Sequence, residues 1–295
     1  MKIADGDFLL PVDKPVGPTS HDVVGMARRA LGTRRVGHTG TLDPFASGLL
    51  VLCVGRATRL AEYFTGLDKR YEAVAKLGAE TDTLDLEGDV VSGDDGWRGL
   101  DRATIESVAQ TQVGQLDQVP PQFSAKRVDG ERMHRRARRG EEIHLAPARV
   151  SVYALTVRDV ALPDVRFSVH CSTGTYVRAI ARDLGRALGC GAHLTALRRT
   201  AVGSFHVDAA LPVQKLADED ALAGARIGPS EALGHLPTVP VDPEMAARIR
   251  NGQRVRIEAS GGTSEALVTV TCGTDLLAMA EIDDGVLRPR KVFAA

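Results

Sequence analysis

The sequence predicts a mixed α and β protein, with a body of about two hundred residues followed by a small β-rich module. Within the body, amphipathic helical patterns are interspersed with short apolar runs of strand character. Two such runs, 149–162 and 164–172, are joined by a Pro-Asp turn and predict an antiparallel hairpin. After about residue 210 the sequence becomes Ala-rich and acidic, typical of a connector or helix, and from residue 237 one helix and several short strands follow.

The composition is that of an ordinary globular protein, with 43% hydrophobic and 25% charged residues and a formal net charge of −1. The 295 residues exceed the usual single-domain length of ~100–150, which favours one large domain and a smaller one. No run approaches the ~20 apolar residues of a membrane span, and the N-terminus MKIADGDFLL lacks the apolar core of a signal peptide. We therefore expect a cytoplasmic protein that does not enter a membrane.

Cysteine usage excludes several classes of protein. Cys53, Cys171, Cys190 and Cys272 lie far apart and form no C-x-x-C pair. Zinc ribbons, thioredoxin-type redox chemistry and a disulfide framework are therefore excluded, and the four are interpreted as small buried hydrophobes. The sequence contains neither a metal-ligand cluster nor a dinucleotide-binding fingerprint, so we expect no metal and no cofactor.

The chain opens with a strand, a turn and a helix. FLLPVDKPVGPTSHDVV begins as a strand and turns at Pro and Gly, and Thr19 or Ser20 can cap a helix that ends near Gly32. Residues 33–48 are expected to form a loop, because three glycines and a proline leave no regular period. The next segment, LLVLCVG at 49–55, is a continuous apolar run bounded by Gly, which is typical of a buried central strand.

The remaining elements follow from the same periodicities. ATRLAEYFTGL predicts a helix, KRYEAVAKLG predicts a strand, and a further helix is expected at 101–113. GERMHRRARRGEE could form a short solvated helix, and LTALRRTAVGSFHV returns to strand. GTYVRAIARDLGRALG is a strong amphipathic helix. In the C-terminal module PEMAARIRNG predicts a helix, and four runs predict strands: RVRIEA, ALVTVTC, LLAMAEID and VLRPRKVF.

The 33–48 loop is the first candidate for a functional site. Its glycines permit close backbone approach, Pro44 stiffens the turn, and Asp43 lies in the middle with His38 nearby. The alternative is that Asp43 only caps a turn through an Asx bond, as Asp before Pro often does. The spacing alone favours neither interpretation.

Two further residues carry weaker signals. Arg178 falls in the first turn of the strong helix, where a cation opposes the helix dipole, so it could serve a distant anion or simply be solvated. Tyr71 follows Lys69 and Arg70 at a strand start. An aromatic ring beside basic side chains suits stacking on a base, and a half-buried core position is the equal alternative.

A basic segment interrupts the otherwise balanced charge. Between Lys126 and Arg139 there are seven Lys or Arg residues and only two acids, Asp129 and Glu131. A phosphate backbone responds to local charge, so this segment suits nucleic-acid contact even though the whole chain is nearly neutral. A solvated helix face is the alternative.

Five ordered motifs resemble a known family. They are DKPVGPTSHDVV, RRVGHTGTLDPFASGLLVLCVGRATRL, DKRYEAVAKLGAETDTLDLEG, PPQFSAKRVDG and CSTGTYVRAIARDLGRALGCGAHLTALRRTAVGSF. In this order and spacing they are similar to the bacterial tRNA pseudouridine-55 synthases of the TruB family, over most of residues 8–210. The C-terminal part is similar in size and position to the PUA-type RNA-binding module of these enzymes.

The resemblance implies a fold, a reaction and a domain division. The fold would be α+β, with a mixed, largely antiparallel sheet in the catalytic domain at 1–225 and a small PUA-like β domain at 235–295. The reaction would convert the uridine at position 55 in the TΨC loop of tRNA to pseudouridine, without a cofactor. A basic RNA-binding insertion at about 122–146 would contact tRNA, with Arg135, Arg136, Arg138 and Arg139 among its cations. No protein partner would be required, and a monomer is expected.

The resemblance also assigns roles to single residues. Asp43 would be the catalytic carboxylate, and Arg178 would pair with it and keep it ionised. Tyr71 would stack on the extruded uracil, with Tyr176 and Leu197 lining the pocket beside it. The target must be flipped out of the RNA, and His38 would contact the displaced bases.

Two matched positions have weaker assignments. Asp85 lies close to the tyrosine in the family pattern and ranks below the other site residues. Lys14 also matches a motif, but backbone support is an alternative to chemistry and it is not counted as catalytic. The sequence leaves open whether Asp43 attacks C1′, adds to C6 of the base or promotes a glycal route.

Two other functions compete with this one. The chain could be an RNA-binding protein or tRNA-folding chaperone with secondary or lost catalysis, although such a binder has no need to keep Asp43, Tyr71 and Arg178 together. It could also be a guide-RNA-dependent pseudouridine synthase of the dyskerin type, against which the basic insertion argues.

Overall fold

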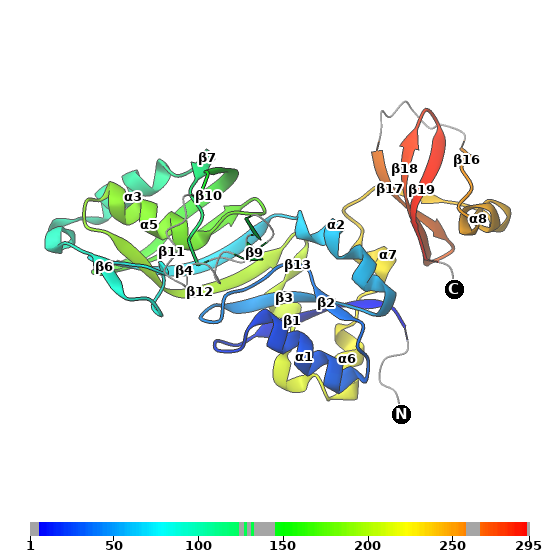
Figure 1. Cartoon of the computed structure of the whole chain (residues 1–295), viewed down its shortest axis with the longest axis horizontal. Helices are drawn as coiled ribbons and strands as arrows, with labels where there is room; N and C mark the ends of the chain where they lie inside the picture. The colour runs from blue at the N-terminus through cyan, green and yellow to red at the C-terminus, as the bar shows by residue number, and fades with distance from the viewer. Residues whose placement is uncertain (1–5, 124–126, 129–130, 133–144, 258–265, 294–295) are drawn as a thin grey trace.

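The computed structural model describes residues 6–123, 127–128, 131–132, 145–257 and 266–293, and places them around two main β sheets (Figure 1). The fold is α+β with largely antiparallel strands, as expected. In the described part of the chain, no helix is long and apolar enough to cross a membrane.

The larger sheet belongs to the body of the molecule. The strands of the body are β1 (Phe8–Lys14), β2 (Val36–His38), β3 (Ser47–Val54), β4 (Lys69–Leu77), β5 (Glu80–Thr81), β6 (Val90–Ser92), β7 (Gly114–Gln118), β8 (Arg127–Val128), β9 (Glu131–Arg132), β10 (Ala148–Ala161), β11 (Asp164–Cys171), β12 (Ala192–Val202), β13 (Phe205–His206) and β14 (Leu211–Pro212). Ten of these pair in one sheet with the central order β14-β1-β3-β12-β4-β11-β10-β7. Strand β2 joins it beside β3, and β13 joins it beside β12.

The helices of the body follow the strands closely along the chain. The α-helices are α1 (Ser20–Leu31), α2 (Ala61–Thr65), α3 (Arg102–Gln110), α5 (Val177–Ala187), α6 (Glu219–Ala225) and α7 (Pro229–Ala232). The 3₁₀ helices are η1 (Gly55–Leu60), η2 (Asp95–Gly99), η3 (Val207–Ala209) and η4 (Val213–Lys215). Helix α1 starts at a capping box between Thr19 and Asp22 and ends at left-handed Gly32, which confirms its predicted limits.

Strand β3 is the central strand that its continuous apolar run predicts. Alternate residues such as Leu50 and Leu52 face α1, whereas Leu49 and Val51 face η1 and α2. Both faces of β3 are covered, so it has no polar side, and seven of its eight residues are buried. On the other half of the sheet, α3 and α5 cover one face of β4, β10, β11 and β12 and form a second core.

A narrow seam joins the two halves of the sheet. Strands β3 and β12 pair in parallel through only two register positions, Arg198 with Ser47 and Arg199 with Gly48. Gly48 has a φ of 103°, and an added Cβ would lie 2.3 Å from the Arg199 carbonyl oxygen. A glycine is therefore required where the halves meet. The loop 39–46, between β2 and β3, leads directly into this seam.

The second sheet forms the C-terminal module. Its elements are β15 (Thr238–Pro240), α8 (Pro243–Arg250), β16 (Val255–Arg256), β17 (Ala266–Cys272), β18 (Asp275–Asp283) and β19 (Val286–Val292). The strands pair in the order β15-β17-β18-β19-β16 and enclose a separate core with α8. The helix and four strands expected from the sequence are all present, and β15 adds a fifth strand.

The sequence prediction was wrong at the start of the basic segment. Glu131–Arg132 form strand β9, which pairs with β8, where a short helix was expected. The Asp-Gly dipeptide at 129–130 is a strong hairpin signal in the sequence, which overrides the weak helical preference of the charged residues. The rest of that predicted helix lies outside the described residues.

Candidate functional site

The 39–46 loop is held rigidly against its surroundings. The Ser20 hydroxyl donates to the Leu42 carbonyl at 3.0 Å and accepts from the Leu42 N–H at 2.8 Å. The Gly17 N–H donates to the Pro44 carbonyl at 2.9 Å, and the Ala46 N–H donates to the Asp43 carbonyl at 3.1 Å. The main chain on both sides of Asp43 is therefore fixed, and its side chain projects from a defined turn.

Lys14 supports the same loop from beneath. Its buried ammonium donates to the carbonyls of Pro15 at 2.9 Å, Pro18 at 2.8 Å and Pro44 at 3.4 Å. Burial lowers the Lys14 pKa to about 8, while the neighbouring Asp43 carboxylate opposes that fall. These contacts are to the backbone, so the geometry matches the support role considered for Lys14.

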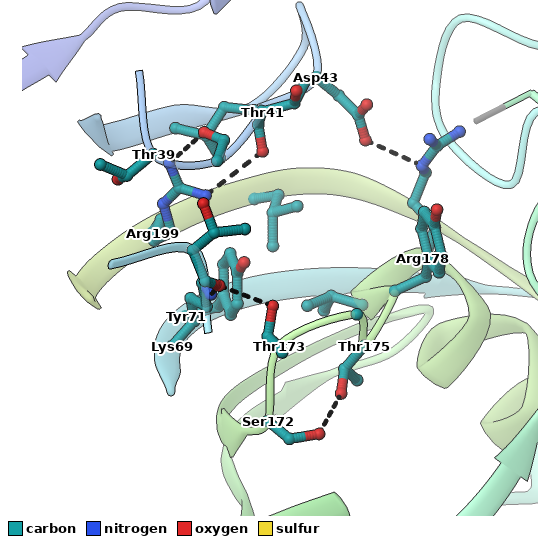
Figure 2. Close-up of a pocket in the computed structure, with 17 residues that line it drawn as sticks. Thr39, Thr41, Asp43, Lys69, Tyr71, Ser172, Thr173, Thr175, Arg178 and Arg199 are labelled. Carbon is teal, nitrogen blue, oxygen red and sulfur yellow. Dashed lines mark hydrogen bonds and ion pairs between the residues drawn. The ribbon is translucent and has the colours of Figure 1, made fainter. Parts of the chain in front are cut away.

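Arg178 lies between two carboxylates. Its Nε is 3.0 Å from Asp43 Oδ2, and its Nη1 is 3.2 Å from Asp85 Oδ2. The same guanidinium donates to the carbonyls of Thr83 at 2.7 Å and Phe123 at 3.0 Å. The Arg178 and Asp85 side chains are each 5% exposed, whereas Asp43 is 34% exposed and faces the cavity. The arginine is therefore fixed by buried groups and directs its Nε to one accessible carboxylate (Figure 2).

Opposing effects act on the acidity of Asp43. Burial raises the pKa of its carboxyl above the ordinary value, and the charge of Asp85 adds to the rise. The charge and hydrogen bond of Arg178, and more weakly the charge of Lys14, oppose it. The Asp43 carboxyl therefore depends on its cationic neighbours to remain ionised.

A cavity of about 230 Å³ opens beside Asp43. Five predicted site residues line it: Asp43, Tyr71, Tyr176, Arg178 and Leu197. The volume is below the ~300–1,000 Å³ of typical small-molecule sites, so it suits a single ring better than a larger ligand. Segments from the 39–46 loop, β4, the start of α5 and β12 meet here, although they are distant in sequence (Figure 2).

Tyr71 has the half-buried core position that was one of its two alternatives. Its ring packs against the core between the sheet and α5, and it also lines the cavity. Burial raises the pKa of its phenol, while the charge and hydrogen bonding of Arg199 act in the opposite direction. The phenol is therefore un-ionised at neutral pH and presents a neutral ring to the cavity.

The remaining predicted site residues do not line the cavity or lie outside the described residues. Asp85, ranked low from the sequence, contacts Arg178 directly and forms the buried end of the ion-pair network. His38 lies in β2 and does not line the cavity, and burial lowers its pKa. The cations of the basic insertion, Arg135, Arg136, Arg138 and Arg139, lie outside the described residues.

Sequence reasoning missed two basic residues of the cavity wall. Arg199 lies in β12 and donates to three carbonyls: Leu49, Thr41 and Gly40. Lys69 lies two residues before Tyr71, and burial lowers its pKa to about 8. The alternation of side chains along a strand was the available signal, since Lys69 and Arg199 share a face with Tyr71 and Leu197 respectively.

Lys69 fixes another wall of the cavity. Its ammonium donates to the carbonyls of Thr65 at 2.6 Å and Leu67 at 2.5 Å. The Thr173 hydroxyl donates to the same Thr65 carbonyl at 2.8 Å. The end of α2 is thereby tied to the segment that precedes α5.

Family comparisons cover most of the chain. Residues 28–177 match the family model described as TruB family pseudouridylate synthase (N terminal domain). Residues 178–234 match tRNA pseudouridylate synthase B C-terminal domain, and residues 237–293 match Pseudouridine synthase II TruB, C-terminal.

Individual relatives agree with this result. The tRNA pseudouridine synthase B of Geobacter sulfurreducens is 43% identical over 263 residues, covering 87% of this chain and 86% of the relative. The tRNA pseudouridine synthase B of Burkholderia mallei is 42% identical over 294 residues, covering 97% of this chain and 96% of the relative.

Solved structures are similar across the whole fold. The chain aligns with one in a Cbf5-Nop10-Gar1 complex at a TM-score of 0.77 and 26% identity, covering 97% of this chain and 85% of the other. It also aligns with a chain in an H/ACA RNP bound to a substrate RNA containing 2′-deoxyuridine, at a TM-score of 0.76 and 24% identity. That alignment covers 98% of this chain and 85% of the other.

Proposed function

This chain belongs to the TruB family of pseudouridine synthases, and we propose that it isomerises the uridine at position 55 in the TΨC loop of tRNA to pseudouridine. The reaction breaks the bond between uracil N1 and ribose C1′, turns the base and joins its C5 to C1′. The proton lost from C5 is balanced by one gained at N1, so the reaction is redox-neutral and releases nothing.

Asp43 is the catalytic carboxylate in this proposal. It is the accessible carboxylate of the cavity, and an electron-poor sugar carbon or the base carbon is the kind of centre that a carboxylate attacks or stabilises. The rigid turn from Leu42 to Ala46 limits the positions that its side chain can take. Such pre-orientation lowers the entropic cost of reaching the reactive geometry.

Arg178 keeps Asp43 ionised and directed toward the reacting base. Its Nε contact at 3.0 Å favours the carboxylate over the carboxylic acid, against the effect of burial. Asp85 compensates the remaining charge of Arg178 and holds it in place. Arg178 and Asp85 thus together support one reactive group, the Asp43 carboxylate.

The cavity receives one flipped base. Extruding a uridine from a folded loop costs a few kcal/mol, which stacking on Tyr71 and contact with Tyr176 and Leu197 would offset. His38 lies in the strand that leads into the catalytic loop, which supports a role next to the displaced bases outside the cavity.

The basic insertion at about 122–146 and the C-terminal module would hold the rest of the tRNA. The seven cations between Lys126 and Arg139, including Arg135, Arg136, Arg138 and Arg139, suit phosphate contacts. We divide the chain into a catalytic domain at 1–225 and a PUA-like domain at 235–295. The enzyme would act as a cytoplasmic monomer, without cofactor or protein partner.

The observation that carries the proposal is the ion pair of accessible Asp43 with buried Arg178 at the cavity that Tyr71 lines. The test is incubation of the purified chain with unmodified tRNA transcript, without guide RNA, followed by mapping of pseudouridine at single-nucleotide resolution. A transcript with cytidine at position 55 is the matched control. Pseudouridine confined to position 55 is the expected result.

Other outcomes distinguish the competing functions. Tight tRNA binding without pseudouridine would indicate an RNA-binding protein or tRNA-folding chaperone. Pseudouridine formed only after addition of a guide RNA would indicate a dyskerin-type enzyme. Either result would overturn the proposed function.

A further inference from the structure

Arg199 is a buried cation that contacts the backbone of the catalytic loop. Its residue is 2% exposed, and its guanidinium points from β12 into the turn that precedes Asp43. Nε donates to the Leu49 carbonyl at 2.8 Å. Nη1 donates to the Thr41 carbonyl at 3.3 Å and Nη2 to the Gly40 carbonyl at 3.1 Å (Figure 2). One side chain therefore binds both the loop segment that precedes Asp43 and strand β3, which follows it.

The position of Arg199 makes these contacts structurally important. Its main chain forms one of the two register pairs between β3 and β12, opposite Gly48. The Arg198 side chain also crosses this seam, to Asp13 and Ser47. The Arg199 side chain adds its three hydrogen bonds to the same seam. Asp43 belongs to the loop that leads into β3, on one side of this seam. Tyr71 of β4 and Leu197 of β12 lie on the other side.

Arg199 also differs from the other arginines nearby. Arg178 pairs with Asp43 and Asp85, and Arg198 pairs with Asp13 through contacts of 3.0 and 2.8 Å. Among the described residues, Arg199 has no carboxylate partner within ion-pair distance. A buried guanidinium is costly unless its donors are well satisfied, and here backbone carbonyls satisfy them.

We propose that Arg199 is a positioning residue of the active site, which holds Asp43 on one half of the sheet in register with Tyr71 on the other. This inference rests on the proposed function. The guanidinium itself does not react; its planar fork spans carbonyls that a single ammonium or amide cannot bridge. The charge of Arg199 also counteracts the effect of burial on the Tyr71 phenol.

The test compares three full-length variants with the wild type. Arg199→Gln removes the charge and the fork, and Arg199→Lys retains the charge alone. Arg198→Gln is the matched control, because it removes a neighbouring arginine of the same strand whose ion pair with Asp13 lies outside the cavity. For each protein we would measure the melting temperature, the tRNA dissociation constant and the single-turnover rate at saturating tRNA transcript.

Misplacement of a catalytic group affects the chemical step more than binding. We expect Arg199→Gln to slow the single-turnover rate by about 100-fold while the dissociation constant changes by less than about threefold. Arg199→Lys should be slowed by about tenfold, because it restores charge but not the fork. Arg198→Gln should stay within about threefold of the wild-type rate even if its melting temperature falls.

The inference would be overturned if Arg199→Gln and Arg198→Gln reacted at the same single-turnover rate. It would also be overturned if Arg199→Gln lost rate and tRNA affinity by the same factor. If Arg199→Gln does not fold, the single-turnover rate of Arg199→Lys is the test. A rate equal to that of the wild type would then reject the positioning role. Failure of both to fold would also reject it, because Arg199 would then be a determinant of the fold. An inactive wild type would instead refute the proposed function.

Discussion

Buried cations surround the Asp43 carboxylate. Lys14, Lys69 and Arg199 donate almost entirely to backbone carbonyls, and only Arg178 contacts Asp43 directly. Burial lowers the pKa of both lysines to about 8, so both remain mostly protonated at neutral pH. Of these cations, Arg178 and Lys14 favour the ionised form of Asp43, and together the four make the surroundings of the cavity positive.

The first prediction concerns the carboxylate itself. Asp43→Asn keeps the size and hydrogen-bonding capacity of the side chain but removes its charge. We expect turnover to vanish while tRNA binding persists within roughly tenfold, about 1.4 kcal/mol. Single-turnover assays and filter binding measure the two quantities, and Asp13→Asn is the control, since Asp13 pairs with Arg198 outside the cavity. Appreciable pseudouridine formation by pure Asp43→Asn protein would refute its essential role.

The second prediction concerns pH. Activity requires ionised Asp43, and burial raises its pKa, so the rate should fall with decreasing pH at a value above the ordinary Asp pKa of ~3.9. Arg178→Met removes the largest opposing effect, so the midpoint of this fall should move to still higher pH. Rate profiles at saturating prefolded tRNA measure both midpoints. A midpoint that stays constant or moves to lower pH in the variant would contradict this account.

The site residues show what the sequence could and could not reveal. Asp43, Tyr71 and Arg178 were predicted from motifs, and the structure brings them to one cavity although up to 135 positions separate them. Arg199 was missed because the sequence LRRT reads as solvated charge, and arginines are rarely buried. Asp85 was ranked low for the same reason. Burial of a charge depends on partners from distant segments, which local patterns do not contain.

At the scale of whole elements, the seam between β3 and β12 lies beside the cavity. Most strands and helices were predictable, because apolar periodicity and capping residues act locally. The order β1-β3-β12-β4 was not, because pairing between distant strands depends on the complete chain. The parallel contact at Gly48 in particular has no sequence signal beyond one glycine in a loop.

The third prediction tests this seam. Gly48→Ala should destabilise the protein through its positive φ and through a clash with the Arg199 backbone, by about 1–3 kcal/mol from strain alone. Gly114→Ala is the control, since Gly114 has a similar φ of 118° with nothing within 4 Å of an added Cβ. Urea unfolding measures the free energy of unfolding of both variants, and Gly48→Ala should lose more of it than Gly114→Ala. Equal losses in the free energy of unfolding would mean that the close approach of Gly48 to the Arg199 backbone adds no further penalty.

The fourth prediction concerns the basic insertion. Neutralising Arg135, Arg136, Arg138 and Arg139 together should remove up to four phosphate contacts. Each lost contact should flatten the slope of log affinity against log salt by ~0.7–0.9, and affinity should fall. The single-turnover rate at saturating RNA should change little, because Asp43 and Arg178 lie in other segments. An unchanged salt slope would show that these side chains form only a solvated face, and RNA contacts should then be sought after residue 237.

At the scale of the molecule, strand β19 of the C-terminal sheet contacts the body through polar and aromatic groups. Arg59 in η1 donates to the Val292 carbonyl at 2.8 Å, and its guanidinium lies 4.9 Å from the Phe293 ring centroid. Lys291 donates to the Arg59 carbonyl at 2.7 Å and pairs with Glu62. Helix α2 continues from this contact to Thr65, which lines the cavity beside Asp43.

The fifth prediction concerns the complete enzyme. Within the described residues, no group of three His, Cys, Asp or Glu side chains is placed to hold a metal ion. We expect full activity on prefolded tRNA in EDTA, without any added small molecule. Rates measured with and without EDTA test this, using the same RNA preparation. A strict need for a divalent ion at the chemical step would contradict a mechanism based on the carboxylate.

Apolar side chains also connect the C-terminal sheet to the body. Leu276 and Met279 of β18 pack in one cluster with Phe64 and Leu233 of the body. A chain shortened to end before Thr238 would leave these body side chains facing water. Contiguous exposed apolar surface promotes self-association. Aggregation of such a truncated protein would therefore obscure any measurement of what the catalytic part can do by itself.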